Sequence, residues 1–146
     1  MLDEERLRVH EQQFIQTATL RPLDEMQAAR ERIKLWHWRA RQLALERQRM
    51  AWPPSGASPE GVSDLRTQGL ATLDGIVRAT ARILREKGDL DESIDDDFVA
   101  KGKPYRELSD DDASELLSIA AQRHQPLNWL CGLALEKDWD AVPVET

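Results

Sequence analysis

A chain of 146 residues, 40% hydrophobic and 32% charged, is typical of one soluble globular domain that folds without disulfides or metal ions. The single cysteine excludes an intrachain disulfide, which suits a reducing compartment. The charged N-terminus and the lack of an apolar run of roughly 18 residues predict a cytoplasmic protein without a membrane span. A formal net charge of −7 argues against nucleic acid as the partner, because phosphate contacts require clustered lysine and arginine.

The N-terminal third of the chain predicts one long helix after a poorly patterned start. Residues 1–20 carry scattered apolar side chains and predict no more than a short helix. Over residues 23–50, steps of three and four define a heptad seam: Met26, Ala29, Ile33, Trp36, Ala40, Leu43, Arg47 and Met50. A second apolar stripe beside it predicts that this helix is covered on two sides, as the spine of a bundle. The seam packs either within one chain or across a two-fold axis, so a homodimer is left open.

The tetrapeptide WHWR at residues 36–39 is the first candidate binding site. An aromatic pair beside arginine can stack nucleic-acid bases or enclose a cation. On a helix, however, Trp36 and Trp38 point about 200° apart, toward different neighbours. Packing of both indoles in the core is therefore the favoured interpretation, with His37 and Arg39 reaching solvent or a carboxylate.

A linker and a second helix follow. Residues 52–59, WPPSGASP, are dense in turn-forming residues and predict a loop. The serine and proline at the end of this loop predict a helix start, and Gly88 predicts the helix end, so we expect a helix over residues 59–87. The loop allows it to run antiparallel to the first helix as a helical hairpin. Gly69 and Gly75 within it indicate close approach of another helix.

An irregular acidic loop is expected over residues 89–108. Between Asp89 and Asp112 the chain holds ten acidic and three basic side chains, so this stretch alone equals the net charge of the whole chain. Carboxylates at alternate positions suggest a calcium loop, but Ile94 and Ala100 stand where that loop requires glycine and glutamate. An irregular divalent-ion site is therefore an alternative, and a solvated loop or one paired with arginines is favoured.

The same loop is the candidate surface for a partner. A long loop that is neither glycine-rich nor uniformly polar is often functional, and carboxylates steer association with a basic protein. The candidate partner-binding residues are Asp95, Asp96, Asp97, Tyr105 and Arg106.

The C-terminal part of the chain predicts a helix interrupted by proline. Ser109 before three aspartates predicts the start, because the hydroxyl accepts from a free amide and the carboxylates favour the positive end of the helix dipole. Pro126 lacks a donor amide and disfavours helical angles in the residue before it. We therefore expect a helix over residues 110–124, a break, and a second helix over residues 126–136.

A histidine and the single cysteine lie close to this break. His124 and Cys131 are two turns apart, but two ligands do not complete a zinc site and the chain has no CxxC or HxxxH motif. The favoured interpretation places Cys131 in the core and lets His124 satisfy backbone carbonyls freed by the break. An alternative polar site for catalysis combines Arg123, His124, Asn128 and Asp140.

The C-terminal sequence also carries the motifs of a known family. The motifs are RH, LNWL and WD at residues 123–124, 127–130 and 139–140, the terminal Thr146, and KLWHWRARQL at residues 34–43. Over residues 30–146 they resemble the bacterial family known as domain of unknown function 4272, from whose pattern Pro126 departs. The family has no assigned chemistry, so the resemblance implies a soluble, mainly helical domain and specifies no activity.

The sequence has no phosphate loop, GxSxG motif or HExxH motif. We therefore predict a single all-α bundle over residues 1–146 that uses no cofactor or metal, and an enzyme is the less favoured reading. Its expected function is to bind a partner protein with a basic surface, as bacterial immunity proteins and antitoxins do. The alternatives are an enzyme of unknown reaction around His124 and a divalent-metal-binding domain that uses the aspartate-rich loop.

Overall fold

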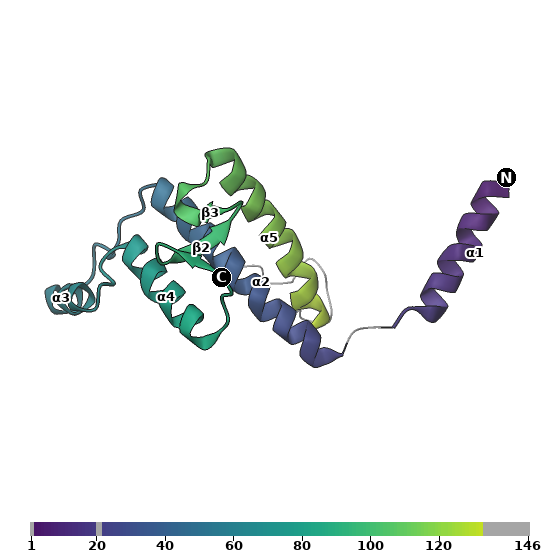
Figure 1. Cartoon of the computed structure of the whole chain (residues 1–146), viewed down its shortest axis with the longest axis horizontal. Helices are drawn as coiled ribbons and strands as arrows, with labels where there is room; N and C mark the ends of the chain where they lie inside the picture. The colour runs from purple at the N-terminus through teal and green to yellow at the C-terminus, as the bar shows by residue number, and fades with distance from the viewer. Residues whose placement is uncertain (1, 20–21, 133–146) are drawn as a thin grey trace.

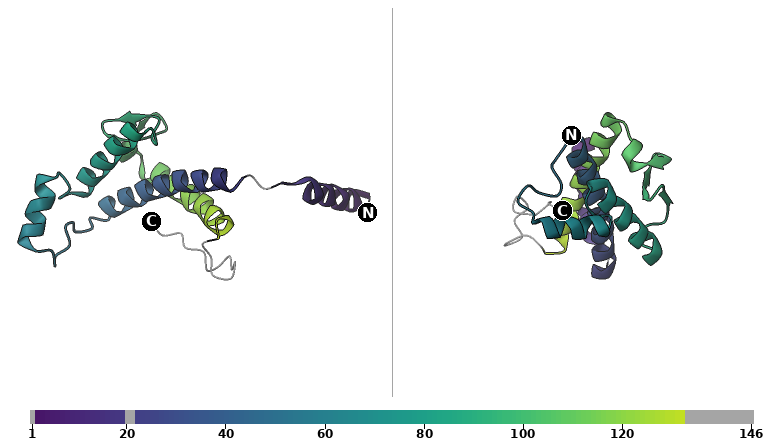
Figure 2. Two further views of the ribbon diagram at one scale, coloured as in Figure 1. Left: turned by 90° about the horizontal axis from the view of Figure 1, so that it is seen from below. Right: turned by 90° about the vertical axis from the view of Figure 1, so that its left-hand side faces the viewer.

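The computed structural model describes residues 2–19 and 22–132, and within them the chain is predominantly helical, as predicted (Figure 1). The helices are α1 (Leu2–Thr17), α2 (Leu23–Arg47), α3 (Pro59–Thr67), α4 (Leu73–Lys87) and α5 (Asp110–Leu130). Figures 1 and 2 show α2, α4 and α5 packed as one body, with α1 standing away from it. No helix in the described ranges is long and apolar enough to cross a membrane.

α2 lies at the centre of this body. α5 packs antiparallel to it, since Asp110 at the start of α5 meets Arg47 at the end of α2, and Asn128 meets Arg30. α4 and a small sheet also pack against α2 (Figure 2). The core that they enclose contains Ala40, Leu43, Ala81, Leu84, Leu90, Phe98, Tyr105 and Leu108. The predicted spine is therefore covered by α5 and by α4 with the sheet.

α5 begins as predicted and continues farther than predicted. The Ser109 hydroxyl accepts a hydrogen bond from the amide of Asp112 at 3.1 Å, which caps the first turn. The expected break is wrong, because the helix runs through Pro126 to Leu130. The proline removes one backbone hydrogen bond, but His124 and Asn128 on either side of it are buried, so packing holds the turn in place. Residues 133–136 of the second helix predicted over residues 126–136 lie outside the described residues.

The helix predicted over residues 59–87 is two helices, α3 and α4. The chain turns between them at Gly69, whose φ is +73°. The Thr72 hydroxyl then caps α4 by accepting from the amide of Gly75 at 2.9 Å. A Cβ at Gly75 would lie 2.1 Å from the carbonyl oxygen of Gly69, so Gly75 permits close approach of this turn rather than of another helix. α4 ends at Gly88 with φ +79°, where the sequence predicts it.

The acidic segment is more regular than expected, because it folds into a three-stranded antiparallel sheet. The elements are β1 (Ser93–Ile94), β2 (Asp97–Ala100), β3 (Lys103–Pro104) and the 3₁₀ turn η1 (Tyr105–Glu107). Each pair of strands is joined by a two-residue turn with positive φ at both positions, Asp95 and Asp96 in the first and Lys101 and Gly102 in the second. Such turns favour Asn-Gly or Asp-Gly, so the Asp-Asp pair gave no hairpin signal in the sequence.

Candidate functional site

The two aspartates of the first hairpin turn are paired with arginines of the same chain. Asp95 lies 3.3 Å from Nη1 of Arg78 and 3.0 Å from Nη1 of Arg106. Asp96 lies 2.6 Å from Nη2 of Arg82, and the hydrogen bond from that arginine lowers the pKa of the Asp96 carboxyl below its usual value. The acidic turn is therefore held against α4 by ion pairs, which is the arginine-paired alternative.

Asp97 is fully buried and forms an internal ion pair with Arg39, which is also fully buried. Its two carboxylate oxygens accept from Nε of Arg39 at 2.7 Å and from Nη2 at 3.0 Å. They also accept from the backbone amides of Phe98 at 2.7 Å and Arg106 at 2.9 Å. The Arg39 guanidinium lies 5.2 Å above the centre of the Tyr105 ring. This pair joins the middle of α2 to the sheet, so Arg39 reaches a carboxylate and not solvent.

The structure brings the predicted partner-binding residues together, but it leaves only part of the set accessible. Asp97 and Tyr105 are buried, and burial raises the pKa of the Tyr105 hydroxyl to about 12. Asp95 and Asp96 reach the surface with their charges already matched by arginines. The carboxylates on which a basic partner was predicted are thus engaged within the chain.

The alternative polar site is divided between two faces of α5. His124 is buried, and its Nδ1 lies 2.9 Å from Nδ1 of His37 on α2. Asn128 is also buried and accepts from Nε of Arg30 at 2.7 Å. Arg123 is exposed on a different face, and Asp140 lies outside the described residues. His124 was expected to satisfy backbone carbonyls freed by a break, and its partner is instead another imidazole.

The two histidines share a hydrogen bond that requires different protonation of the two Nδ1 atoms. One ring must donate through Nδ1 and the other must accept, so at least one Nδ1 carries no proton. Burial, followed by the charge of Arg41, lowers the pKa of His37, and burial, followed by His37 and Arg30, lowers the pKa of His124. Both rings therefore favour the neutral form at neutral pH. Because they are shielded from solvent, we assign this pair to the contact between α2 and α5.

The described residues also bear on a metal site. In residues 2–19 and 22–132, no three histidine, cysteine, aspartate or glutamate side chains are placed to hold a metal ion. The carboxylates of the aspartate-rich turn point to arginines, as described above.

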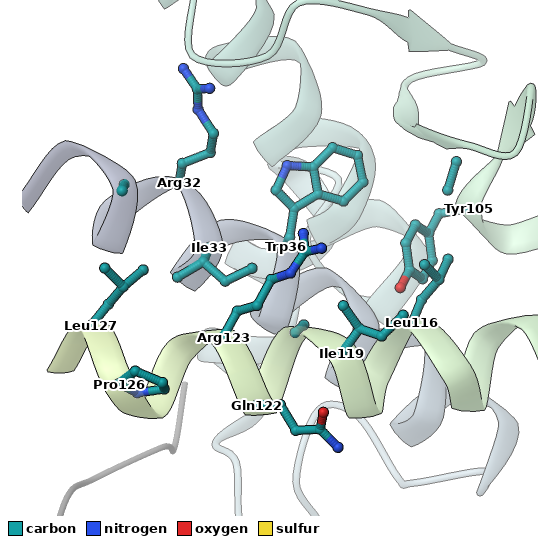
Figure 3. A pocket seen from close by; sticks show the side chains of 13 residues that line it. Arg32, Ile33, Trp36, Tyr105, Leu116, Ile119, Gln122, Arg123, Pro126 and Leu127 are labelled. Atoms are coloured by element: carbon teal, nitrogen blue, oxygen red, sulfur yellow. The ribbon is translucent and has the colours of Figure 1, made fainter. Parts of the chain in front are cut away.

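A groove lies between α2 and α5. Its volume is about 670 Å³, within the range of ligand-binding sites. It is lined by Ala29, Arg32, Ile33, Trp36, Ala100, Tyr105, Leu116, Ile119, Ala120, Gln122, Arg123, Pro126 and Leu127. Figure 3 shows Tyr105 at one end of the groove, Pro126 and Leu127 at the other, and side chains of both helices between them.

The wall of the groove is apolar and its charge is positive. The Trp36 ring meets Phe98 edge to face, with 5.1 Å between ring centres, and this contact fixes one wall. Arg32 and Arg123 are exposed beside the groove, and no described lining residue is a carboxylate. Within residues 22–132, neither arginine takes part in an ion pair, which distinguishes them from the arginines around the acidic turn.

The sequence contained a signal for this groove that the prediction did not use. Ala29, Ile33 and Trp36 belong to the heptad seam of α2, which was expected to be covered by other helices. In the structure α5 passes beside these three residues and leaves them on an open surface. On α5, Leu116, Ala120 and Leu127 repeat at helical spacing along the facing wall.

No family model matches the chain, and neither a curated protein nor a solved structure is significantly similar to it. The resemblance to domain of unknown function 4272 therefore stays a prediction.

Proposed function

We propose that this protein is a non-enzymatic binding protein whose groove between α2 and α5 receives an amphipathic helix. The observation that carries the proposal is the combination of an apolar groove with two exposed arginines and no described carboxylate. The whole chain has a net charge of −7, whereas the surface around the groove is positively charged. It therefore selects an occupant with apolar side chains flanked by carboxylates.

The shape and chemistry of the groove support a helix as its occupant. Helix-binding grooves hold apolar anchors spaced three and four residues apart, and the side chains of two neighbouring helices provide such holes. Trp36 and Arg123 are residue types that dominate binding energy at protein interfaces. An immunity- or antitoxin-like role takes the same form, with the acidic helix carried by a toxin.

This proposal replaces the basic partner with an acidic one for a physical reason. Carboxylates that already pair with Arg78, Arg82 and Arg106 gain little from a new cation, because the existing pairs must first be broken. Arg32 and Arg123 have no such pairs to break among the described residues. The unmatched charge of the described surface therefore favours carboxylates at the groove.

Site-specific photocrosslinking in cells tests the proposal. A benzophenone amino acid replaces Gln122, which is exposed in the groove, and in a control chain it replaces Ile83, which is 51% exposed on α4. We expect a defined adduct from position 122 and none from position 83. Peptide mapping should place the adduct on a helical segment with apolar residues beside aspartate or glutamate. Arg123→Glu should abolish that adduct without changing the circular dichroism spectrum.

Two results would contradict the proposal. One is the absence of a defined adduct from position 122, and the other is an adduct that persists unchanged when Arg123 is reversed. An adduct on a basic segment would count against an acidic occupant, because Arg32 and Arg123 flank the groove.

A further inference from the structure

α1 displays apolar side chains that nothing in the described structure covers. Leu7, Phe14 and Ile15 are 64%, 73% and 72% exposed, and Figures 1 and 2 show their helix away from the body. A single helix of 16 residues is marginally stable in water, because its formation relies on packing of an apolar face. α1 is therefore expected to pack on another surface.

The pattern of α1 matches the groove. Leu7, Glu11 and Phe14 follow one another at steps of four and three, which places them on one face, and Ile15 borders that face. A carboxylate between two apolar anchors is the arrangement that an apolar groove with flanking arginines selects. Glu5 lies on the opposite face of the helix from Leu7 and Phe14, so it provides an internal comparison.

We propose that α1 of a second copy of this chain occupies the groove, so that two copies form a dimer by exchanging their N-terminal helices. This inference rests on the proposed function, since it names a helix that the same groove receives. Exchange of a terminal helix uses one complementary pair of surfaces twice. Two such contacts together allow a short helix to bury the roughly 1,600 Å² of surface that is typical of a standard complex.

The start of α2 favours a second copy over the chain's own groove. Pro22, immediately before α2, has φ −51° and ψ 146°, which is an extended conformation in which proline holds φ. Pro22 is thus not part of the helix, and α1 lies beyond that end of α2 and not along the groove (Figure 1). A helix presented in this way is available to a neighbouring molecule.

A charge-reversal exchange tests the inference on the full-length chain. Glu11→Arg places two cations together in one chain's homodimer, and Arg123→Glu places two carboxylates together in the other's. We expect each variant alone to weaken dimerisation about tenfold or more, measured by light scattering and sedimentation. Mixing the two variants pairs each reversed helix with a reversed groove, so the mixture should recover dimers. Glu5→Arg is the matched control and should dimerise like the wild type.

The alternative outcomes are separable. A monomeric wild type whose α1 amides are protected from hydrogen exchange, with protection lost in Arg123→Glu, would assign α1 to its own groove and overturn the dimer. A monomer with unprotected α1 amides, or a dimer unaffected by Phe14→Asp, would also overturn it. In either case an adduct from position 122 to another protein would leave the proposed function standing, and the absence of any adduct would remove both.

Discussion

Replacing Asp97 with asparagine should destabilise the fold far more than the same change at the neighbouring Asp96. Asp97 is fully buried and accepts four hydrogen bonds, two from Arg39 and two from backbone amides. Asparagine keeps the volume but removes the carboxylate that pairs with the buried Arg39 cation, and its amide group faces other donors. Removing one partner of a buried ion pair costs about 3–5 kcal/mol.

This loss is a large part of the total stability of a domain, which is about 5–15 kcal/mol. For a chain of this size it corresponds to a fall of roughly 6–20 °C in melting temperature. Thermal and urea unfolding followed by circular dichroism measure the effect. Asp96→Asn should leave the melting temperature nearly unchanged, because the ion pair between Asp96 and Arg82 is exposed to solvent. Equal losses in the two variants would refute the assignment of Asp97 as the anchor of the sheet.

Replacing both members of the pair provides an internal check on the cause. If the uncompensated cation is the source of the loss, then Arg39→Met combined with Asp97→Leu should recover part of the stability that Asp97→Asn removes. A double variant that is less stable than Asp97→Asn would indicate that the attraction itself, or the bonds to the backbone amides, dominates.

Two further predictions concern the histidine pair and the turn at Gly75. The pKa values of His37 and His124 are lowered in the folded state. The stability that this pair contributes should therefore be fully present above the unfolded pKa of about 6.5. It should fall as the pH drops below that pKa, since only the unfolded chain then binds protons. Urea midpoints between pH 7.5 and 5.5 should show this fall, and His124→Gln should flatten it; an unchanged slope would contradict the burial of His124 in its neutral form as a cause of the fall. Gly75→Ala should destabilise by about 1–3 kcal/mol, because its Cβ would lie 2.1 Å from the Gly69 carbonyl oxygen. Gly56→Ala, which meets nothing within 4 Å, should be nearly neutral in the same thermal assay, and equal effects would contradict the close approach.

Helix ends were the most predictable part of the fold, because local chemistry determines them. Ser109 and Gly88 cap and terminate their helices through groups within a few residues of each other, and the sequence displays those groups directly. Pro126 shows the limit of this reasoning. Its local preference against a helix is real, but burial of the residues around it outweighs one missing hydrogen bond, and burial depends on distant residues.

The contacts that define the site are distant in sequence, which is why the sequence could not assign them. Arg39 and Asp97 are 58 residues apart, and His37 and His124 are 87 residues apart. Net charge could not show which carboxylates stay accessible, since ten acidic side chains in one stretch do not reveal which arginines fold onto them. The sequence indicated only one wall of the groove, as part of the heptad seam of α2. That wall stays open because of how α5 crosses α2, which the sequence does not specify.

The buried polar pairs give α2 a role beyond that of an apolar spine. Apolar contacts between two helices tolerate sliding, whereas the His37–His124 and Arg30–Asn128 hydrogen bonds are satisfied in one register only. On the other side, the Arg39–Asp97 pair fixes the sheet that carries Tyr105, one end of the groove. These polar contacts therefore hold both ends of the groove wall in place before any helix binds. Such preorganisation lowers the cost of ordering the interface, so substitutions at these buried pairs should weaken helix binding even where the folded chain survives.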